Sequence, residues 1–247
     1  MFGDVAVPRG GALGMAVLLR IFAGLDVGPG AVRTAVSRLA ADGWLQGVRA
    51  GRSSTYRLTG KALESYAAAA RRVYGPPPAW DGRLRVLLPE PGVVLDGYGQ
   101  VAPGAWLAVP GTGGPEGTPH IDGQVSLAHA RQLANRAWPP AATAPAFERF
   151  MQVFAPVQAW IDAGHRVTEQ DALTLRILLV HEFRRAVLRD PALPLELRPA
   201  GWVGGPARTL CGAVYRGLLP ASGRWLDLHG RAFDRPLPPA SGAHDRF

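Results

Sequence analysis

The sequence predicts an α+β protein with a helix-turn-helix and a β-hairpin at its amino-terminal end, a small central domain and a mainly helical carboxy-terminal part. Three observations predict this class. Apolar residues recur at helical spacing in two stretches before residue 42, the pattern changes to short strands at 44–58, and helical periodicity returns from residue 126. The chain has 247 residues, 47% of them hydrophobic, which suffices for a buried core in each part.

The first two helices are expected to pack on each other. Residues 11–25, "GALGMAVLLRIFAGL", have the periodicity of a helix, and "DVGPG" is typical of the turn that follows. The second helix is expected at 30–41, where Val32, Val36 and Leu39 stand at i, i+4 and i+7 and form one apolar face. The opposite, polar face consists of Arg33, Thr34, Ser37 and Arg38.

A hairpin and a third helix come next. The hairpin is expected to have strands at 44–49 and 55–58, with residues 50–52 near its turn. The third helix is expected at 60–74, and "GPPP" ends it. Two helices joined by a glycine-containing turn and followed by such a hairpin form a winged helix-turn-helix.

The composition of this module suits a DNA duplex. The second helix of a winged helix-turn-helix enters the major groove, where arginine can make two hydrogen bonds to guanine and Ser or Thr can contact bases or phosphates. Short or cationic donors at a hairpin tip suit phosphate oxygens or a narrow minor groove. The DNA-binding residues predicted in this way are Arg33, Thr34, Ser37, Arg38, Arg49, Arg52, Ser53 and Ser54.

The remainder of the chain begins with strands and ends with helices. Strands are expected at 84–88 and 105–109, and "PGTGGPEGTP" is typical of a loop. Helical patterns follow in "SLAHARQLANRAW", "AFERFMQVFAPVQAWIDAG", "EQDALTLRILLVHEFRRAVLRD", with Thr168 as its N-cap, and 206–218. The predicted division is a DNA-binding domain at 1–75, a central α+β domain at 79–124, a helical domain at 125–232 and a flexible tail at 233–247.

The charge supports a polyanionic partner. The net charge is +8, and residues 1–75, with ten basic and four acidic side chains, account for +6 of it. Cys211 is the single cysteine, so no internal disulfide and no cysteine-based zinc site is expected. The sequence has no signal-peptide pattern and no apolar run of about 18 residues, so we expect a cytoplasmic protein without membrane contact.

Motifs of common enzyme classes are incomplete. "HEFRR" starts like a zinc-protease motif, but Arg185 stands where the second histidine is required. "GYGQVA" is followed by Pro103 and Gly104 instead of a helix, which argues against a nucleotide site. Neither a P-loop nor a GxSxG motif occurs. We therefore predict that the protein is not an enzyme and uses no catalytic residue, metal ligand or cofactor.

The segments "FGDVAVPRGG", "VRTAVSRLAADGWL", "GRSSTYRLTGKA", "RRVYG" and "WDGRLRVLL" resemble the amino-terminal half of the PaaX family, repressors of phenylacetic-acid catabolic genes. "LLVHEFRRAVLRDPALPLELRPAGWVGGPARTL" resembles the carboxy-terminal domain of that family. The resemblance implies a winged helix, a ferredoxin-like central domain and a helical effector and dimerisation domain. Because "PEPGVVLDG" replaces a longer segment of the family, the ferredoxin-like domain is expected to be shortened.

The resemblance also implies a homodimer that leaves its DNA operator when an aryl-acetyl-CoA thioester, such as phenylacetyl-CoA, binds. A CoA thioester is a polyanion with an apolar acyl end, so its site needs guanidinium groups and an apolar pocket. Residues with this chemistry in the resembling blocks are Arg184, Arg185, Trp202 and Arg208.

Two alternatives remain open. The first is a metal-dependent nuclease in which the winged helix presents DNA to the central domain, because acidic residues such as Asp81, Asp96 and Asp122 can bind metal if they converge. Aspartates at turns are more commonly capping residues. The second is an acyl-CoA-binding module that has no DNA function.

Overall fold

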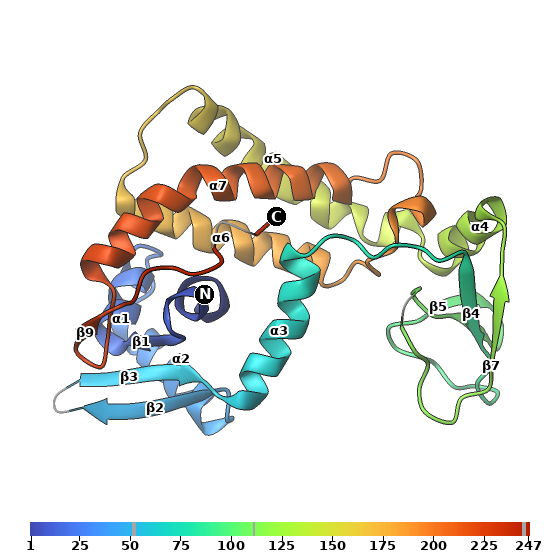
Figure 1. Cartoon of the computed structure of the whole chain (residues 1–247), viewed down its shortest axis with the longest axis horizontal. Coiled ribbons are helices and arrows are strands. Elements are labelled where there is room, and N and C mark those ends of the chain that lie inside the picture. Colours follow the sequence, from blue (N-terminus) through green and yellow to red (C-terminus); the bar gives the residue numbers. More distant parts are fainter. Residues whose placement is uncertain (51–52, 111, 244–245) are drawn as a thin grey trace. The chain divides into compact units, whose positions relative to one another are not determined.

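The computed structural model describes residues 1–50, 53–110, 112–243 and 246–247 (Figure 1). Helices predominate in these ranges, and small antiparallel sheets accompany them. The described residues form two compact units, each built from separate stretches of the chain. Unit 1 consists of Met1–Gly75, Met151–Arg184 and Arg208–Phe247, and unit 2 consists of Pro76–Phe150 and Arg185–Ala207.

The division into units differs from the division by sequence pattern. The boundary expected after residue 75 also separates the two units, whereas the helical domain expected at 125–232 contributes residues to both. The helices that contain residues of both units are α5 (Ala144–Asp162), α6 (Glu169–Val187) and α7 (Gly204–His229). The assignment of functions to the four predicted parts stays a prediction. Within the described ranges, no helix has the length and apolar character needed to cross a bilayer.

The amino-terminal stretch of unit 1 begins with two short helical turns and a strand. Its elements are η1 (Phe2–Ala6), η2 (Val7–Arg9), β1 (Ala12–Gly14), α1 (Met15–Ala23) and α2 (Pro29–Ala41). The first helix expected at 11–25 is therefore too long at both ends. Gly10 and Gly11 have φ values of +83° and +79°, which no right-handed helix contains, and the next three residues pair with residues 55–57 as an edge strand.

A three-stranded sheet and a helix complete this stretch. The further elements are β2 (Leu45–Ala50), β3 (Ser53–Leu58) and α3 (Gly60–Tyr74). All pairs are antiparallel, and the strand order is β1-β3-β2. Both strands of the expected hairpin are present with shifted ends, and β1 is an additional strand. Thr59 caps α3 by accepting a hydrogen bond from the Ala62 N–H at 3.3 Å, and the helix ends before the prolines.

Unit 2 contains a four-stranded antiparallel sheet and a helix that packs on it. Its elements are β4 (Arg83–Leu87), β5 (Gly99–Ala102), β6 (Ala105–Leu107), β7 (His120–Gln124), α4 (Leu127–Ala137), η3 (Pro140–Ala142) and η4 (Leu195–Leu197). The strand order is β5-β6-β4-β7. Among the described residues, the connections from β4 to β5 and from β6 to β7 contain no helix, and α4 follows the last strand. A ferredoxin-like assignment of this shortened sheet stays a prediction.

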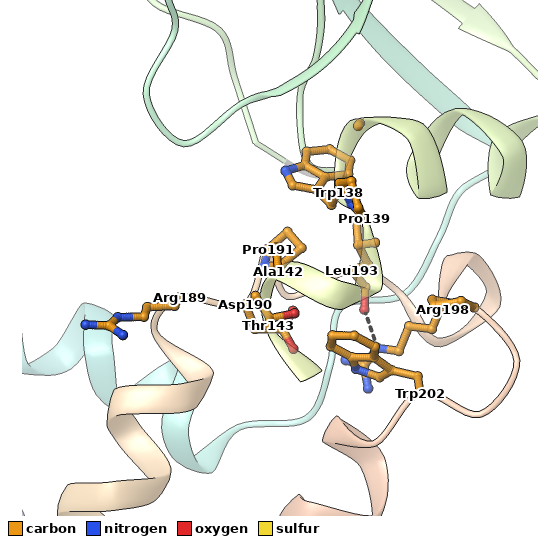
Figure 2. Close-up of a pocket in the computed structure, with 12 residues that line it drawn as sticks. Trp138, Pro139, Ala142, Thr143, Arg189, Asp190, Pro191, Leu193, Arg198 and Trp202 are labelled. Atoms are coloured by element: carbon orange, nitrogen blue, oxygen red, sulfur yellow. Dashed lines mark hydrogen bonds between the residues drawn. The ribbon is translucent and has the colours of Figure 1, made fainter. Parts of the chain in front are cut away.

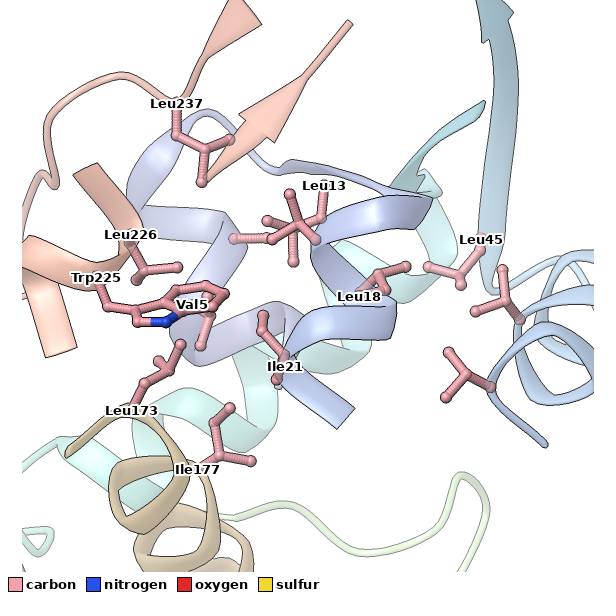
Figure 3. Packing of buried hydrophobic residues seen from close by; sticks show 14 residues of the cluster. Val5, Leu13, Leu18, Ile21, Leu45, Leu173, Ile177, Trp225, Leu226 and Leu237 are labelled. Carbon is pink, nitrogen blue, oxygen red and sulfur yellow. The ribbon is translucent and has the colours of Figure 1, made fainter. Parts of the chain in front are cut away.

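A hydrophobic cluster of unit 1 joins residues near the amino terminus to residues near the carboxy terminus (Figure 3). Figure 3 shows Ile21 of α1 close to Ile177 of α6, and Val5 beside Trp225 of α7. The buried apolar residues of this cluster are Val5, Ala6, Leu13, Val17, Leu18, Ile21, Val32, Val36, Leu45, Leu173, Ile177, Trp225, Leu226 and Leu237. The first 75 residues therefore bury their apolar surface against the carboxy-terminal helices.

Asp4 of η1 is a buried carboxylate, 3% exposed, with two arginine partners. Its Oδ2 atom lies 3.0 Å from Nε of Arg176 in α6, and its Oδ1 atom accepts a hydrogen bond from Nη1 of Arg246 at 2.5 Å. The hydroxyl of Tyr215 in α7 donates to Oδ1 at 3.0 Å. The Asp4 carboxylate therefore connects η1 with α6, α7 and the last residues of the chain.

The electrostatics of this cluster favour the ionised carboxylate. Burial alone would raise the pKa of Asp4, but the positive charges of Arg176 and Arg246 outweigh burial and hold the pKa below its usual range. Burial and the charge of Asp4 raise the pKa of Tyr215 to about 12, so its hydroxyl stays a hydrogen-bond donor at neutral pH. The buried charges are thus matched by opposite charges and hydrogen bonds, as a low-dielectric interior requires.

Described residues of the carboxy-terminal segment have packing contacts, and the flexible tail expected at 233–247 stays a prediction. β8 (Arg231–Ala232) and β9 (Arg235–Pro236) form a short hairpin. The Phe247 ring centroid lies 5.2 Å from that of Tyr74 and 5.8 Å from that of Phe183. The Arg246 ion pair and these aromatic contacts give the segment buried partners that its polar sequence does not suggest.

Replacing Asp4 is expected to destabilise unit 1 strongly. Asp4→Asn leaves two guanidinium groups without their counter-charge, and breaking a buried pair costs about 3–5 kcal/mol. Urea unfolding at pH 7 measures this loss. The matched control is Asp122→Asn, because Asp122 forms an exposed pair with Arg85, and we expect it to unfold like the wild type.

The contribution of Asp4 to the stability of the folded chain depends on pH. Because the pKa of Asp4 is lower in the folded chain than in the unfolded chain, its contribution is present above the unfolded value, about 3.9, and is lost as pH falls through the folded pKa. The difference between the wild type and Asp4→Asn should therefore shrink below pH 4. A constant difference from pH 7 to pH 3 contradicts this account.

Candidate nucleic-acid interface

The two faces of α2 differ in burial. Val32 and Val36 are 3% and 5% exposed and pack in the core of unit 1, where Ala40 continues their row. Leu39 is 40% exposed, contrary to the expectation that it shares this face. The buried row follows i+4 steps, so the residue after Val36 on that face is Ala40. The four residues expected on the polar face, Arg33, Thr34, Ser37 and Arg38, are all exposed.

The described arginines predicted to bind DNA have no carboxylate partner among the described residues. Among the described residues, Arg33, Arg38 and Arg49 have no ion-pair partner, whereas Arg85 and Arg224 are paired with carboxylates. A guanidinium without a carboxylate keeps its full charge for a phosphate or the acceptor edge of guanine. The exposed side of α2 thus combines two free guanidinium groups with two hydroxyls.

The pairing of β2 with β3 places part of the hairpin on the same side of the sheet as the helices. Arg49 stands opposite Ser54. Gly47, two residues before Arg49 on the same strand, stands opposite Tyr56. Because side chains alternate along a strand, Arg49 and Ser54 share a face with Tyr56. Tyr56 packs against the core that α1 and α2 form, and α2 contacts β2. Arg49 and Ser54 therefore extend the helix-packed face of the sheet.

Among the described hairpin residues predicted to bind DNA, Ser53 does not add to this face. Ser53 alternates with Ser54 and lies on the opposite face, together with the buried Thr55. Thr55 is occupied there, because its hydroxyl oxygen accepts a hydrogen bond from the N–H of Phe233 at 2.9 Å. Arg52 lies outside the described residues. The candidate interface within the described ranges consists of Arg33, Thr34, Ser37, Arg38, Arg49 and Ser54, and their contact with DNA stays a prediction.

Comparisons with known proteins bear on this arrangement. The family model "PaaX-like protein" matches residues 1–62, and "PaaX-like protein C-terminal domain" matches residues 138–228. The "Transcriptional repressor PaaX" of Escherichia coli (strain K12) is 31% identical over 277 residues, which cover 100% of this chain and 87% of the repressor. The chain belongs to the PaaX family. The first matched region of this PaaX-family chain contains α1, α2 and both strands of the hairpin.

A solved structure shares the fold. The uncharacterized protein Rv0674 from Mycobacterium tuberculosis superposes with a TM-score of 0.57 at 18% identity, over 89% of this chain and 95% of that one. At this identity the similarity concerns the fold alone. The mixed helical and antiparallel-sheet architecture of the PaaX-family chain is therefore found in a second protein.

The residues predicted for an effector have different roles in the fold. Arg208 donates from Nη1 to the Val73 carbonyl at 3.0 Å and from Nη2 to the Arg72 carbonyl at 2.7 Å, so it caps the end of α3 within unit 1. The other predicted residues are the exposed Arg184 in unit 1, and in unit 2 the exposed Arg185 and the half-buried Trp202.

Other residues considered from the sequence as ligand or metal sites contact neighbouring residues in the structure. Trp202 lines a cavity with Trp138, a residue that the sequence pattern did not single out because it stands at the end of a helix before two prolines. Asp81 accepts a backbone hydrogen bond from Arg83 at 3.0 Å, and Asp122 is paired with Arg85. Within the described ranges, no group of three or more His, Cys, Asp or Glu side chains is placed to hold a metal ion.

The role of α2 can be tested on one arginine. Arg38→Ala should weaken operator binding by about 1–3 kcal/mol if the guanidinium contacts a base edge. Fluorescence anisotropy of labelled operator DNA measures the change in Kd. Arg166→Ala removes the same charge from an exposed position between α5 and α6 and serves as the control. Equal operator affinities of the two variants would show that Arg38 does not contact a base.

Proposed function

We propose that this PaaX-family chain is a transcriptional repressor that binds duplex DNA through α2 and the β2–β3 hairpin, in the manner of a winged helix-turn-helix. The observation that carries the proposal is the exposed α2 face with two free arginines and two hydroxyls, next to a hairpin that presents Arg49 and Ser54. The family membership supports it, because the curated relative is a transcriptional repressor.

In the proposed complex, the contacts divide by their chemistry. Arg33, Thr34, Ser37 and Arg38 enter the major groove, where arginine discriminates guanine and the hydroxyls adapt to bases or phosphates. Arg49 and Ser54 contact the sugar-phosphate backbone beside that groove and set the register of the helix. The chain acts as a homodimer on an inverted repeat, because two equal half-sites match a twofold axis.

The proposed signal is an aryl-acetyl-CoA thioester such as phenylacetyl-CoA, and the controlled genes are those of phenylacetate-type catabolism. The resemblance to the PaaX family supports this choice. For release, the thioester must bind more tightly to a form of the dimer whose recognition helices no longer match the operator. A coupling free energy of about 1–3 kcal/mol is typical and lowers DNA affinity roughly 5- to 150-fold.

One titration tests both parts of the proposal. Labelled DNA from the upstream region of the chain's own gene is titrated with protein at 50 and 200 mM salt, with and without phenylacetyl-CoA. We expect specific binding that weakens with salt, with a log–log slope of about −0.9 per neutralised phosphate. We also expect the thioester, but not CoA alone, to release the DNA.

The controls separate the alternatives. The same DNA with a scrambled sequence reports non-specific binding, and its Kd should be higher than that of the operator. Incubation with magnesium or manganese reports cleavage, which is expected only of a nuclease. Thioester binding without any DNA binding would contradict the repressor function and favour an acyl-CoA-binding module.

A further inference from the structure

Unit 2 contains a cavity of about 170 Å³ with mostly apolar walls (Figure 2). The walls come from three stretches of the chain, at 137–143, 189–193 and 198–202. The bulky apolar side chains that line it are Trp138, Trp202, Pro191 and Leu193. Two indole rings facing one small space are typical of a site for another flat apolar group.

Both indole rings are held in place by their surroundings. Trp138 lies so close to Gly99 that a Cβ atom there would come within 2.7 Å of Cε2 of the ring. Trp202 packs edge-to-face on the buried Phe147, with ring centroids 5.9 Å apart. A Cβ atom at Gly204 would come within 2.6 Å of Nε1 of Trp202. The walls of the cavity are therefore formed by packing rather than by mobile side chains.

Two of the charged residues that line the cavity bond to the backbone. Nε of Arg198 donates to the Leu193 carbonyl at 2.9 Å, and the buried Asp190 accepts from the Ala192 N–H at 2.8 Å. Burial lowers the pKa of Arg198 below its usual value, and the charge of Asp190 opposes this shift. Figure 2 shows the Arg189 side chain directed away from the other lining residues. The interior thus suits an uncharged group, because its walls are mostly apolar and a bare carboxylate would lose its hydration there.

The volume limits the size of that group. An apolar cavity of about 150 Å³ binds benzene, so 170 Å³ holds one aromatic ring and little more. We propose that this cavity is a ligand site that takes the single uncharged aromatic ring of an aryl-acyl compound between Trp138 and Trp202. The choice of an arylacetyl group among single-ring ligands rests on the proposed function. The cavity itself does not.

The cavity lies where three helices begin or end, so a bound ligand lies next to helices that extend into unit 1. Thr143 directly precedes α5, Asp190 follows α6, and Trp202 precedes α7. Further along these helices, α6 carries Arg176 and α7 carries Tyr215, the partners of Asp4 in unit 1. A ring in the cavity therefore acts at the ends of the helices whose other parts hold unit 1 together.

A matched pair of variants tests the site. Ala142 and Ala141 are neighbouring exposed residues of η3, but only Ala142 lines the cavity. Ala142→Phe puts a ring where the ligand ring would lie, whereas Ala141→Phe adds the same side chain beside the cavity. Isothermal titration calorimetry of the full chain is carried out with phenylacetyl-CoA, CoA alone and phenylacetate, and melting curves check that both variants fold.

We expect Ala142→Phe to bind phenylacetyl-CoA roughly 10- to 100-fold more weakly than the wild type, the effect of excluding one aromatic ring, and Ala141→Phe to bind like the wild type. Binding of phenylacetate that Ala142→Phe blocks also supports the site and makes the free acid the carrier of the ring. Equal binding by both variants, equal affinity for CoA and its thioester, or no binding at all overturns it.

The outcome for the site can be distinguished from the outcome for the repressor function. If the wild type binds its operator and phenylacetyl-CoA releases it in both variants alike, the repressor function stands and the cavity is not its effector site. If Ala142→Phe blocks the thioester while the wild type binds no DNA, the cavity is a ligand site and the repressor function fails.

Discussion

A carboxylate that is 3% exposed has to be matched by cations and hydrogen bonds, and Asp4 takes its partners from distant parts of the chain. Arg176 lies in α6, Tyr215 in α7, and Arg246 one residue before the last described one. η1 therefore keeps its position only while α6, α7 and the carboxy-terminal segment keep theirs. The apolar core of unit 1 follows the same division, since residues of α1 and α2 share it with residues of α6 and α7.

The arginines of unit 1 have different roles in the fold. Arg176, Arg208 and Arg246 are used inside the fold, where carboxylates or helix-end carbonyls accept their hydrogen bonds. Arg33 and Arg38 point out from α2 and keep their charge. An excess of positive charge by itself says only that a polyanion is a suitable partner. Burial of some arginines and exposure of Arg33 and Arg38 leave two free positive charges on the outer side of α2 in this PaaX-family chain.

The sequence was informative where the signal is local. The spacing of Val32 and Val36 predicted the buried side of α2, although Leu39, expected on that side, is 40% exposed. The segment "GPPP" marked the end of α3. Non-local contacts were not accessible in this way. The partners of Asp4 lie 172 and 242 positions away, β1 forms only because residues 55–57 pair with it, and the cavity of unit 2 is assembled from three separate stretches. Composition also gave no sign that Arg246 and Phe247 are anchored, because the residues before them are typical of a loop.

The proposed function depends on the claim that the exposed face of α2 meets DNA. A photo-cross-linking amino acid at Ser37 tests this most directly, with the same group at the exposed Val153 of α5 as the reference position. The full chain is irradiated on its operator, and the cross-linked bases are mapped. We predict cross-links from position 37 to bases within the operator and none from position 153. Operator binding without cross-links from position 37 would contradict the claim, because the helix face would then lie away from the groove.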